Sequence, residues 1–104
     1  MALFEWHTTL QAQDLCSQLR AGITSLGLVI DPLTSNHVQL FASDPVDTPM
    51  RHASRVTVLA AWTNQAQGEV KIEVRSQEPM LRKGTRCETT ALALQRLFPA
   101  QRIA

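Results

Sequence analysis

The strictest pattern in this chain is an uninterrupted alternation of charged and β-branched side chains over residues 69–75. Its charged positions are Glu69, Lys71, Glu73 and Arg75, and its branched positions are Val70, Ile72 and Val74. A period of two predicts a β-strand with one buried and one exposed face. Ten residues after this strand, Thr85 and Glu88 have the spacing of a capping box, which predicts a helix starting at about Arg86.

Two helices are predicted from apolar side chains that recur at helical spacing. The second, residues 86–98, stops before Pro99 and buries Cys87, Ala91, Leu94 and Phe98. The first has a longer apolar stripe, made of Ala12, Leu15, Cys16, Leu19, Ile23 and Leu26. Thr8 or Thr9 is the expected N-cap of this first helix, and Gly27, in preference to Gly22, is its expected end.

Three further segments alternate as half-buried strands do, namely residues 3–7, 37–42 and 54–63. Residues 43–50 carry two prolines and are predicted to be a loop, and residues 64–68 are predicted to connect the last two strands as a hairpin. The order β-α-β-β-β-α predicts an α+β two-layer sandwich, in which an antiparallel sheet carries both helices on one face. The chain is interpreted as a single domain, residues 1–104.

Composition excludes several classes of protein. Hydrophobic residues make up 44% of the chain and charged residues 18%, which is typical of a folded globular domain and not of a disordered one. No apolar run is long enough to cross a membrane, and no leader is evident at the N-terminus. Two cysteines are too few for a secreted disulfide framework. A cytoplasmic location without membrane contact is therefore expected.

The sequence contains no recognisable catalytic or metal-binding motif. The four glycines are scattered, so they form neither a phosphate loop nor a dinucleotide fingerprint. The three histidines share no metal-ligand spacing with each other or with the cysteines. Asp44 and Asp47 are interpreted as residues that form a turn and aid solubility. No catalytic residue, metal or cofactor is therefore predicted.

Charge is distributed unevenly along the chain. The net charge of +1 conceals a balance of −4 in residues 1–50 and of +5 in residues 51–104. The second helix begins inside a basic loop that consists of Arg82, Lys83, Gly84, Thr85 and Arg86. If the strand at 54–63 pairs antiparallel with the strand at 69–75, this loop is joined at one end of the sheet by Arg51, Arg55 and Arg75. These eight residues are the candidate binding site.

Three functions are compatible with this site. The first is a non-enzymatic binding module that docks an acidic protein partner, or forms a homodimer, through the basic end of the sheet. The second is binding of a small phosphorylated or carboxylated ligand to the helix start at Gly84 and Thr85. The third is a thiol enzyme that uses Cys87, because a helix start favours a thiolate. Nucleic acid is disfavoured, since no aromatic side chain lies among the cations for base stacking.

Each of these functions competes with a purely structural interpretation. Thr85 and Glu88 can satisfy the amides of the helix start by themselves, and the cations of the basic loop can simply be solvated. Cys87 can be the first member of the buried stripe, because buried cysteine is a common small hydrophobe.

The stretch from Val74 to Cys87, with the sequence VRSQEPMLRKGTRC, resembles that of small uncharacterised cyanobacterial proteins. The resemblance covers the last third of the chain and implies a cytoplasmic protein without assigned chemistry, and no site residue is carried over from it. The order of elements also resembles half of a TATA-binding-protein-type repeat, which is a likeness of fold that does not transfer function.

Overall fold

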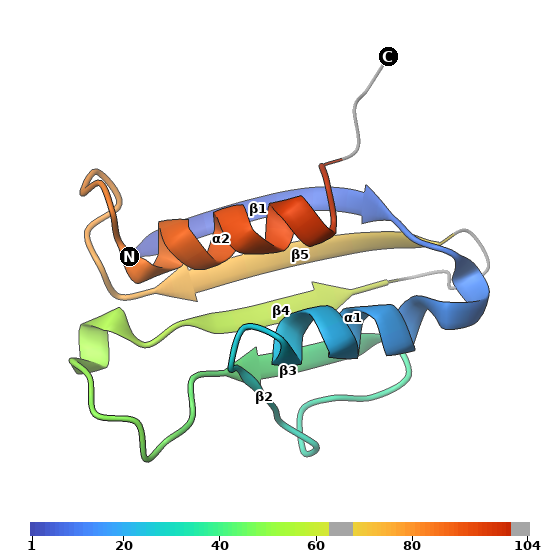
Figure 1. Ribbon diagram of the computed structural model, residues 1–104, viewed down its shortest axis with the longest axis horizontal. Helices are drawn as coiled ribbons and strands as arrows, with labels where there is room; N and C mark the ends of the chain where they lie inside the picture. Colours follow the sequence, from blue (N-terminus) through green and yellow to red (C-terminus); the bar gives the residue numbers. More distant parts are fainter. Residues whose placement is uncertain (63–67, 101–104) are drawn as a thin grey trace.

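The computed structural model describes residues 1–62 and 68–100, and it shows an antiparallel sheet covered on one face by two helices (Figure 1). The strands are β1 (Ala2–Thr9), β2 (Val29–Ile30), β3 (Gln39–Ser43), β4 (Thr57–Ala61) and β5 (Glu69–Ser76). The helices are α1 (Leu15–Thr24) and α2 (Arg86–Leu97), with short 3-10 turns at Ala12–Asp14 and His52–Ser54. The strand order in the sheet is β1-β5-β4-β3-β2, and every neighbouring pair is antiparallel.

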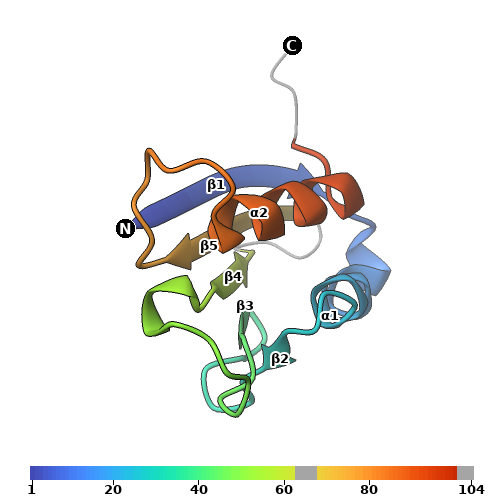
Figure 2. The ribbon, with the colours of Figure 1, turned by 60° about the vertical axis from the view of Figure 1, so that its left-hand side comes forward.

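This arrangement confirms the predicted α+β sandwich with both helices on one face. The apolar run at Leu28–Ile30 adds the short strand β2, so the order of elements is β-α-β-β-β-β-α. Helix α2 packs on β1 and β5, and α1 packs on β2 and β3. Figure 2, turned by 60°, shows that the opposite face of the sheet carries no helix. Because both helices lie on one face of the sheet, the second face, which carries polar and apolar side chains, is open to solvent.

The core lies between the sheet and the helices, where the alternating strands meet the helical stripes. In β5, the branched residues Val70, Ile72 and Val74 are buried, whereas their charged neighbours are not. The four residues expected from the sequence are buried: Cys87, Ala91 and Leu94 in α2, and Phe98 directly after its end at Leu97. Trp6 from β1 is also buried, and its indole N–H donates to the carbonyl of Phe98 at 2.9 Å. This contact ties the end of α2 to the edge strand.

The start of the first helix differs from the prediction. Strand β1 continues to Thr9, which pairs with Glu69, and the Leu10 amide then donates to the Gly68 carbonyl at 2.8 Å. Sheet pairing therefore uses the backbone groups that a helix cap at Thr8 or Thr9 would need, and Thr8 is buried against the core. The α-helix begins only at Leu15, with no side-chain cap.

The rest of the first helix follows its stripe. Leu15, Leu19 and Ile23 are buried, and Cys16 and Leu26 pack against the core. The helix ends at Thr24, and the following turn closes at Gly27, whose φ of 82° is a left-handed conformation that suits glycine. The side chain of Ala12, the first residue of the predicted stripe, lies outside the described part of the chain.

The two middle strands are shorter than predicted but bury the expected side chains. Leu40 and Ala42 from β3 and alternate residues from Val56 to Trp62 along β4 face the core. Val38 differs, because the chain turns there: the Val38 amide donates to the side chain of Asn36, and Val38 stays exposed. Most of the predicted hairpin at residues 64–68 lies outside the described residues, as does Thr63.

Candidate binding surface at the basic end of the sheet

The candidate residues gather at one end of the sheet, which we call the basic end. Here β3 and β5 finish while β1 and β4 begin, and Thr57 of β4 pairs with Arg75 of β5. The predicted proximity of the two basic groups along the chain is thereby confirmed for this pair of strands. The loop after β5 also meets the turn before β4, since the Gln77 amide donates to the Ala53 carbonyl at 3.0 Å. Helix α2 starts above the same end (Figure 1).

Arg86, the first residue of α2, is held by Asp44. Its two terminal nitrogens contact the two carboxylate oxygens at 2.5 and 3.0 Å, and the Val56 amide donates to the same carboxylate at 2.8 Å. Burial disfavours the charged form of Asp44, but the bonds from Arg86 and Val56 outweigh it and lower the pKa of this carboxyl below its ordinary value. Arg86 therefore has a structural role, because it joins the start of α2 to the loop after β3. Asp44 is its buried partner, so the interpretation of Asp44 as a residue that only forms a turn and aids solubility is wrong.

Glu78 occupies the helix start as an internal anion. It is 7% exposed, and its oxygens accept from the amides of Arg86 and Cys87 at 3.0 Å each and from the Ser76 hydroxyl at 2.8 Å. Burial works against ionisation of Glu78, but these three donors outweigh it and lower the pKa of the carboxyl. A carboxylate at a helix N-terminus is stabilised by the amide dipoles. The protein thus supplies its own anion at the position where the small-ligand hypothesis places an external one.

The capping residue itself behaves as the sequence predicts. Thr85 is buried, and its hydroxyl accepts from the Glu88 amide at 3.1 Å. Glu88 reaches back to the amide of Gly84 at 3.4 Å, one residue before the cap. Gly84 has a φ of 73°, so it provides the left-handed turn into the helix. Together with Glu78, these contacts give internal acceptors to the amides on which the small-ligand hypothesis depended.

Arg55 is also used by the fold. Its guanidinium donates to three carbonyls of the loop between β3 and β4, those of Pro45, Val46 and Thr48, at 2.9, 3.1 and 2.9 Å. A planar fork with several donors suits such a role. Arg55 therefore shapes the loop, while its charge remains part of the basic end.

The remaining candidates point to solvent. Arg75 forms an ion pair with Glu73 at 2.9 Å and stays half exposed. Arg51, Arg82 and Lys83 are exposed and form no ion pair with any residue that the structure describes. Two large apolar side chains stand on the same loops, with exposed fractions of 92% for Val46 and 97% for Leu81. Single exposed apolar residues are ordinary, but here Leu81 directly precedes the exposed Arg82, and Val46 stands on the same loop as Arg51.

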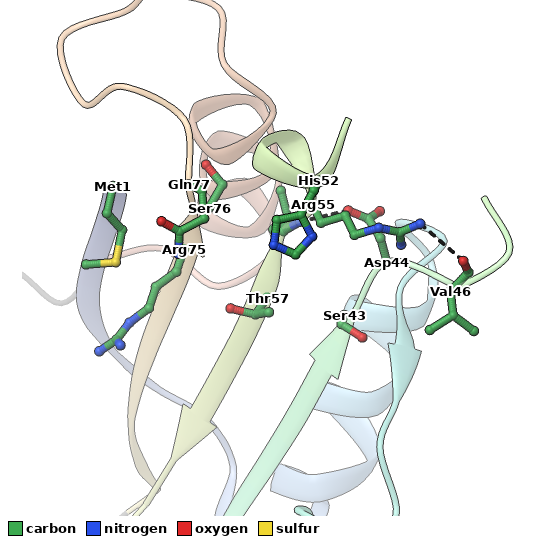
Figure 3. Close-up of a pocket in the computed structure, with 11 residues that line it drawn as sticks. Met1, Ser43, Asp44, Val46, His52, Arg55, Thr57, Arg75, Ser76 and Gln77 are labelled. Atoms are coloured by element: carbon green, nitrogen blue, oxygen red, sulfur yellow. Dashed lines mark hydrogen bonds between the residues drawn. The ribbon is translucent and has the colours of Figure 1, made fainter. Parts of the chain in front are cut away.

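A groove of about 470 Å³ opens between these loops on the uncovered face of the sheet (Figure 3). The ring of His52 and the side chain of Thr57 lie near its centre, with Arg75 to one side and Ser43 and Arg55 to the other. Within the described residues, the hydroxyls of Ser43 and Thr57 have no side-chain hydrogen bond. The groove therefore offers polar groups that the fold leaves unused. His52 is not one of the eight candidate residues, although it lies between Arg51 and Arg55 in the second basic group of the sequence.

Cys87 lies in the core, in agreement with its interpretation as the first residue of the buried stripe of α2. Its side chain is fully buried and its thiol donates to the Val74 carbonyl at 3.3 Å. Burial raises the pKa of the Cys87 thiol, so the group stays protonated at neutral pH. The geometry gives no support to the thiol-enzyme hypothesis. Among residues 1–62 and 68–100, no cluster of three or more acidic, cysteine or histidine side chains is arranged to hold a metal ion.

None of the described helices is long and apolar enough to cross a membrane. Comparison with protein-family models finds no family that matches the chain, and comparison with curated proteins finds no significant relative. The resemblance of residues 74–87 to cyanobacterial proteins therefore remains a prediction.

Proposed function

We propose that this protein is a non-enzymatic binding module that docks an acidic protein partner at the basic end of its sheet. The observation that carries the proposal is the combination of Arg51, Arg82 and Lys83 with the exposed side chains of Val46 and Leu81. Val46 lines the groove, Arg51 stands on the same loop, and the other three stand on the loop that follows β5. Within the described residues, none of the three charges takes part in an ion pair. Arginine is enriched in protein interfaces, and apolar side chains are buried at their centres.

The chemistry of this end favours an acidic polypeptide over a small ligand. The helix amides that would grip a phosphate already have Glu78 and Thr85 as acceptors. The exposed cations instead lie apart on two loops, which suits several carboxylates spread along a chain. The exposed side chains of Val46 and Leu81, on the same two loops, give such a partner apolar surface to bury. Self-association through the same end is disfavoured, because it would bring like charges together.

The test is a matched pair of charge reversals. The double variant Arg51→Glu, Arg82→Glu changes the basic end, whereas Arg20→Glu, Arg96→Glu makes the same change in net charge at exposed helical sites. Arg86 is left intact because its loss would strand the buried Asp44. The probe is a fluorescein-labelled peptide of alternating glutamate and leucine residues, whose binding is followed by fluorescence anisotropy at low and at physiological salt.

We expect the basic-end variant to weaken peptide binding about tenfold, which corresponds to about 1.4 kcal/mol, and the control variant to bind as the wild type does. Binding by the wild type should also weaken at higher salt, since exposed charges are screened. Equal losses in both variants, or none in either, would contradict the proposal. Displacement of the peptide by inorganic pyrophosphate, at matched ionic strength with chloride, would favour a small anionic ligand instead.

A further inference from the structure

Strand β1 is an edge strand, and beyond Leu3 no hydrogen bond among the described residues uses the outer side of its backbone. It pairs with β5 over its whole length, without a bulge or a proline, and no described strand pairs with its other side. The Leu3 amide points outward, to the sulfur of Met80 at 3.4 Å, whereas the Leu10 amide points inward, to Gly68. Because amide direction alternates along a strand, the amides of Glu5 and His7 also point outward. Natural proteins usually protect an edge of this length.

The outer face of this edge is complementary to itself. Glu5 and His7 are both exposed, lie two residues apart and face the side of the sheet that carries no helix. If a second β1 pairs antiparallel about a two-fold axis at Trp6, each Glu5 lies opposite a His7 of the other copy. An imidazole N–H donates to a carboxylate whether or not the ring is charged. Neighbouring registers place Glu5 opposite Glu5, or His7 opposite His7, and like groups directly opposite are disfavoured.

Helix α2 brings an apolar side chain to the same place. Its buried stripe faces the sheet, and Thr90 and Ala93 line a small cavity together with Leu26, from the turn that follows α1. Leu92 therefore lies on the opposite flank, above β1, and is 53% exposed. Gln95 shares this flank by helical spacing.

Leu92 also lies near the level of the two-fold axis. Cys87 contacts Val74, which pairs with Phe4, and α2 runs alongside β1 in the same direction (Figure 1). Five helical residues rise roughly 7.5 Å, which equals about two residues of strand, and this brings Leu92 to the level of Trp6. With strands about 4.8 Å apart, two α2 helices that each lie between β1 and β5 would be about 10 Å apart, which is a normal distance for packed helices.

We propose that the protein forms a homodimer by antiparallel pairing of β1 with β1 of a second copy about Trp6. The two sheets become one continuous sheet, Glu5 and His7 form two symmetric cross-strand pairs, and the two Leu92 side chains meet between the α2 helices. The basic ends then lie at opposite ends of the joint sheet, because the paired strands run in opposite directions. The dimer therefore leaves both proposed docking surfaces free, and neither proposal depends on the other.

The first test exchanges the charges at the pair. Sedimentation velocity over a range of concentrations should show a dimer for the wild type, and Glu5→Lys should raise the dimer dissociation constant at least about tenfold. The double variant Glu5→Lys, His7→Glu should restore dimerisation, because it rebuilds the pair with its charges exchanged. It also keeps an acidic group near Lys71, the neighbour of Glu5 at 3.4 Å. Glu69→Lys, an exposed change on β5, is the control and should have no effect.

The second test addresses the helices and the backbone. Leu92→Lys should weaken the dimer, whereas Thr89→Lys should not, because Thr89 is also exposed on α2 but lies on the side of the cavity that it lines with Leu26. Hydrogen exchange should show protection of the Glu5 and His7 amides that increases with protein concentration. A chain that stays monomeric, a dimer that Glu5→Lys leaves unchanged, or a charge exchange that fails to restore pairing would overturn the proposal.

Discussion

At the scale of single residues, two buried carboxylates organise the end of the molecule where the sequence drew attention to cations. Asp44 binds Arg86, and Glu78 binds the first amides of α2. Both carboxyls stay charged because donors surround them, and a buried charge without partners would be costly. Several cations at this end are therefore part of the fold, whereas Arg51, Arg82 and Lys83 are exposed and form no ion pair with the residues that the structure describes.

We expect Glu78→Gln to lower the free energy of unfolding by about 1.5–3 kcal/mol at neutral pH. The neutral amide cannot accept from all three donors as strongly as the carboxylate does. Glu88→Gln is the control, because Glu88 lies in the first turn of α2 and its carboxylate makes, among the described residues, only the 3.4 Å contact to the Gly84 amide. Urea unfolding at pH 7 measures both. A loss for Glu78→Gln no larger than that for Glu88→Gln would contradict the assigned role of Glu78.

At the scale of elements, the two helices approach each other closely where α1 carries a glycine. A Cβ atom at Gly22 would lie 2.5 and 2.7 Å from two ring atoms of Phe98. Gly22 was the less favoured candidate for the end of the first helix, and it lies inside α1, as the stripe to Leu26 implies. The missing side chain makes room for the aromatic ring that closes the core below α2.

The variant Gly22→Ala should be destabilising by about 1 kcal/mol. Alanine improves helix propensity by up to about 1 kcal/mol, but overpacking against a ring costs about 1–3 kcal/mol, so the clash dominates. In a Phe98→Leu background the clash is absent, and the same change should stabilise the protein. Thermal or urea unfolding of the wild type, the two single variants and the double variant measures the change in stability caused by Gly22→Ala in each background. A stabilising effect of Gly22→Ala in the wild type would show that the ring moves aside without cost.

At the scale of the whole molecule, the opposite charges of the two halves of the chain are partly used to join them. Asp44 pairs with Arg86, and Glu5 pairs with Lys71 at 3.4 Å, so these two ion pairs take their acid from the first half and their cation from the second. The pair between Asp44 and Arg86 also connects the loop after β3 to the start of α2. The Glu5 pair is exposed and contributes little to stability.

Stability should fall in acid because of Asp44 and Glu78. Both folded-state pKa values lie below the ordinary values of 3.8 and 4.5, so folding favours the charged forms. The stabilisation is complete above the ordinary pKa values and is lost as the pH falls through the lower, folded-state values. The urea midpoint should be level between about pH 5 and 7 and fall steeply below about pH 4. In Glu78→Gln the fall should be shallower, and an unchanged slope would contradict the role of Glu78 in this loss.

Local pattern was sufficient for most of the fold. The alternation at β5 and the cap and stripe of α2 are properties of neighbouring residues, and both elements appear where they were predicted. The start of the first helix was not predictable in this way, because pairing of Thr9 with Glu69 involves residues far apart in the chain. The backbone at Thr8 and Thr9 can either cap a helix or pair in the sheet, and the presence of β5 beside it decides for pairing.

The sequence by itself determined the fold class, the buried faces and the concentration of positive charge in the second half. Only the tertiary structure decided which charges are available, because ion pairs depend on distances between residues that folding brings together. Arg86 and Lys83 are equivalent in the sequence of the basic loop, yet Arg86 meets Asp44 while Lys83 faces solvent. The spacing of residues along the chain shows which faces of the strands and helices are apolar. The partner of a charged side chain, in contrast, depends on which distant segments the folded sheet brings together.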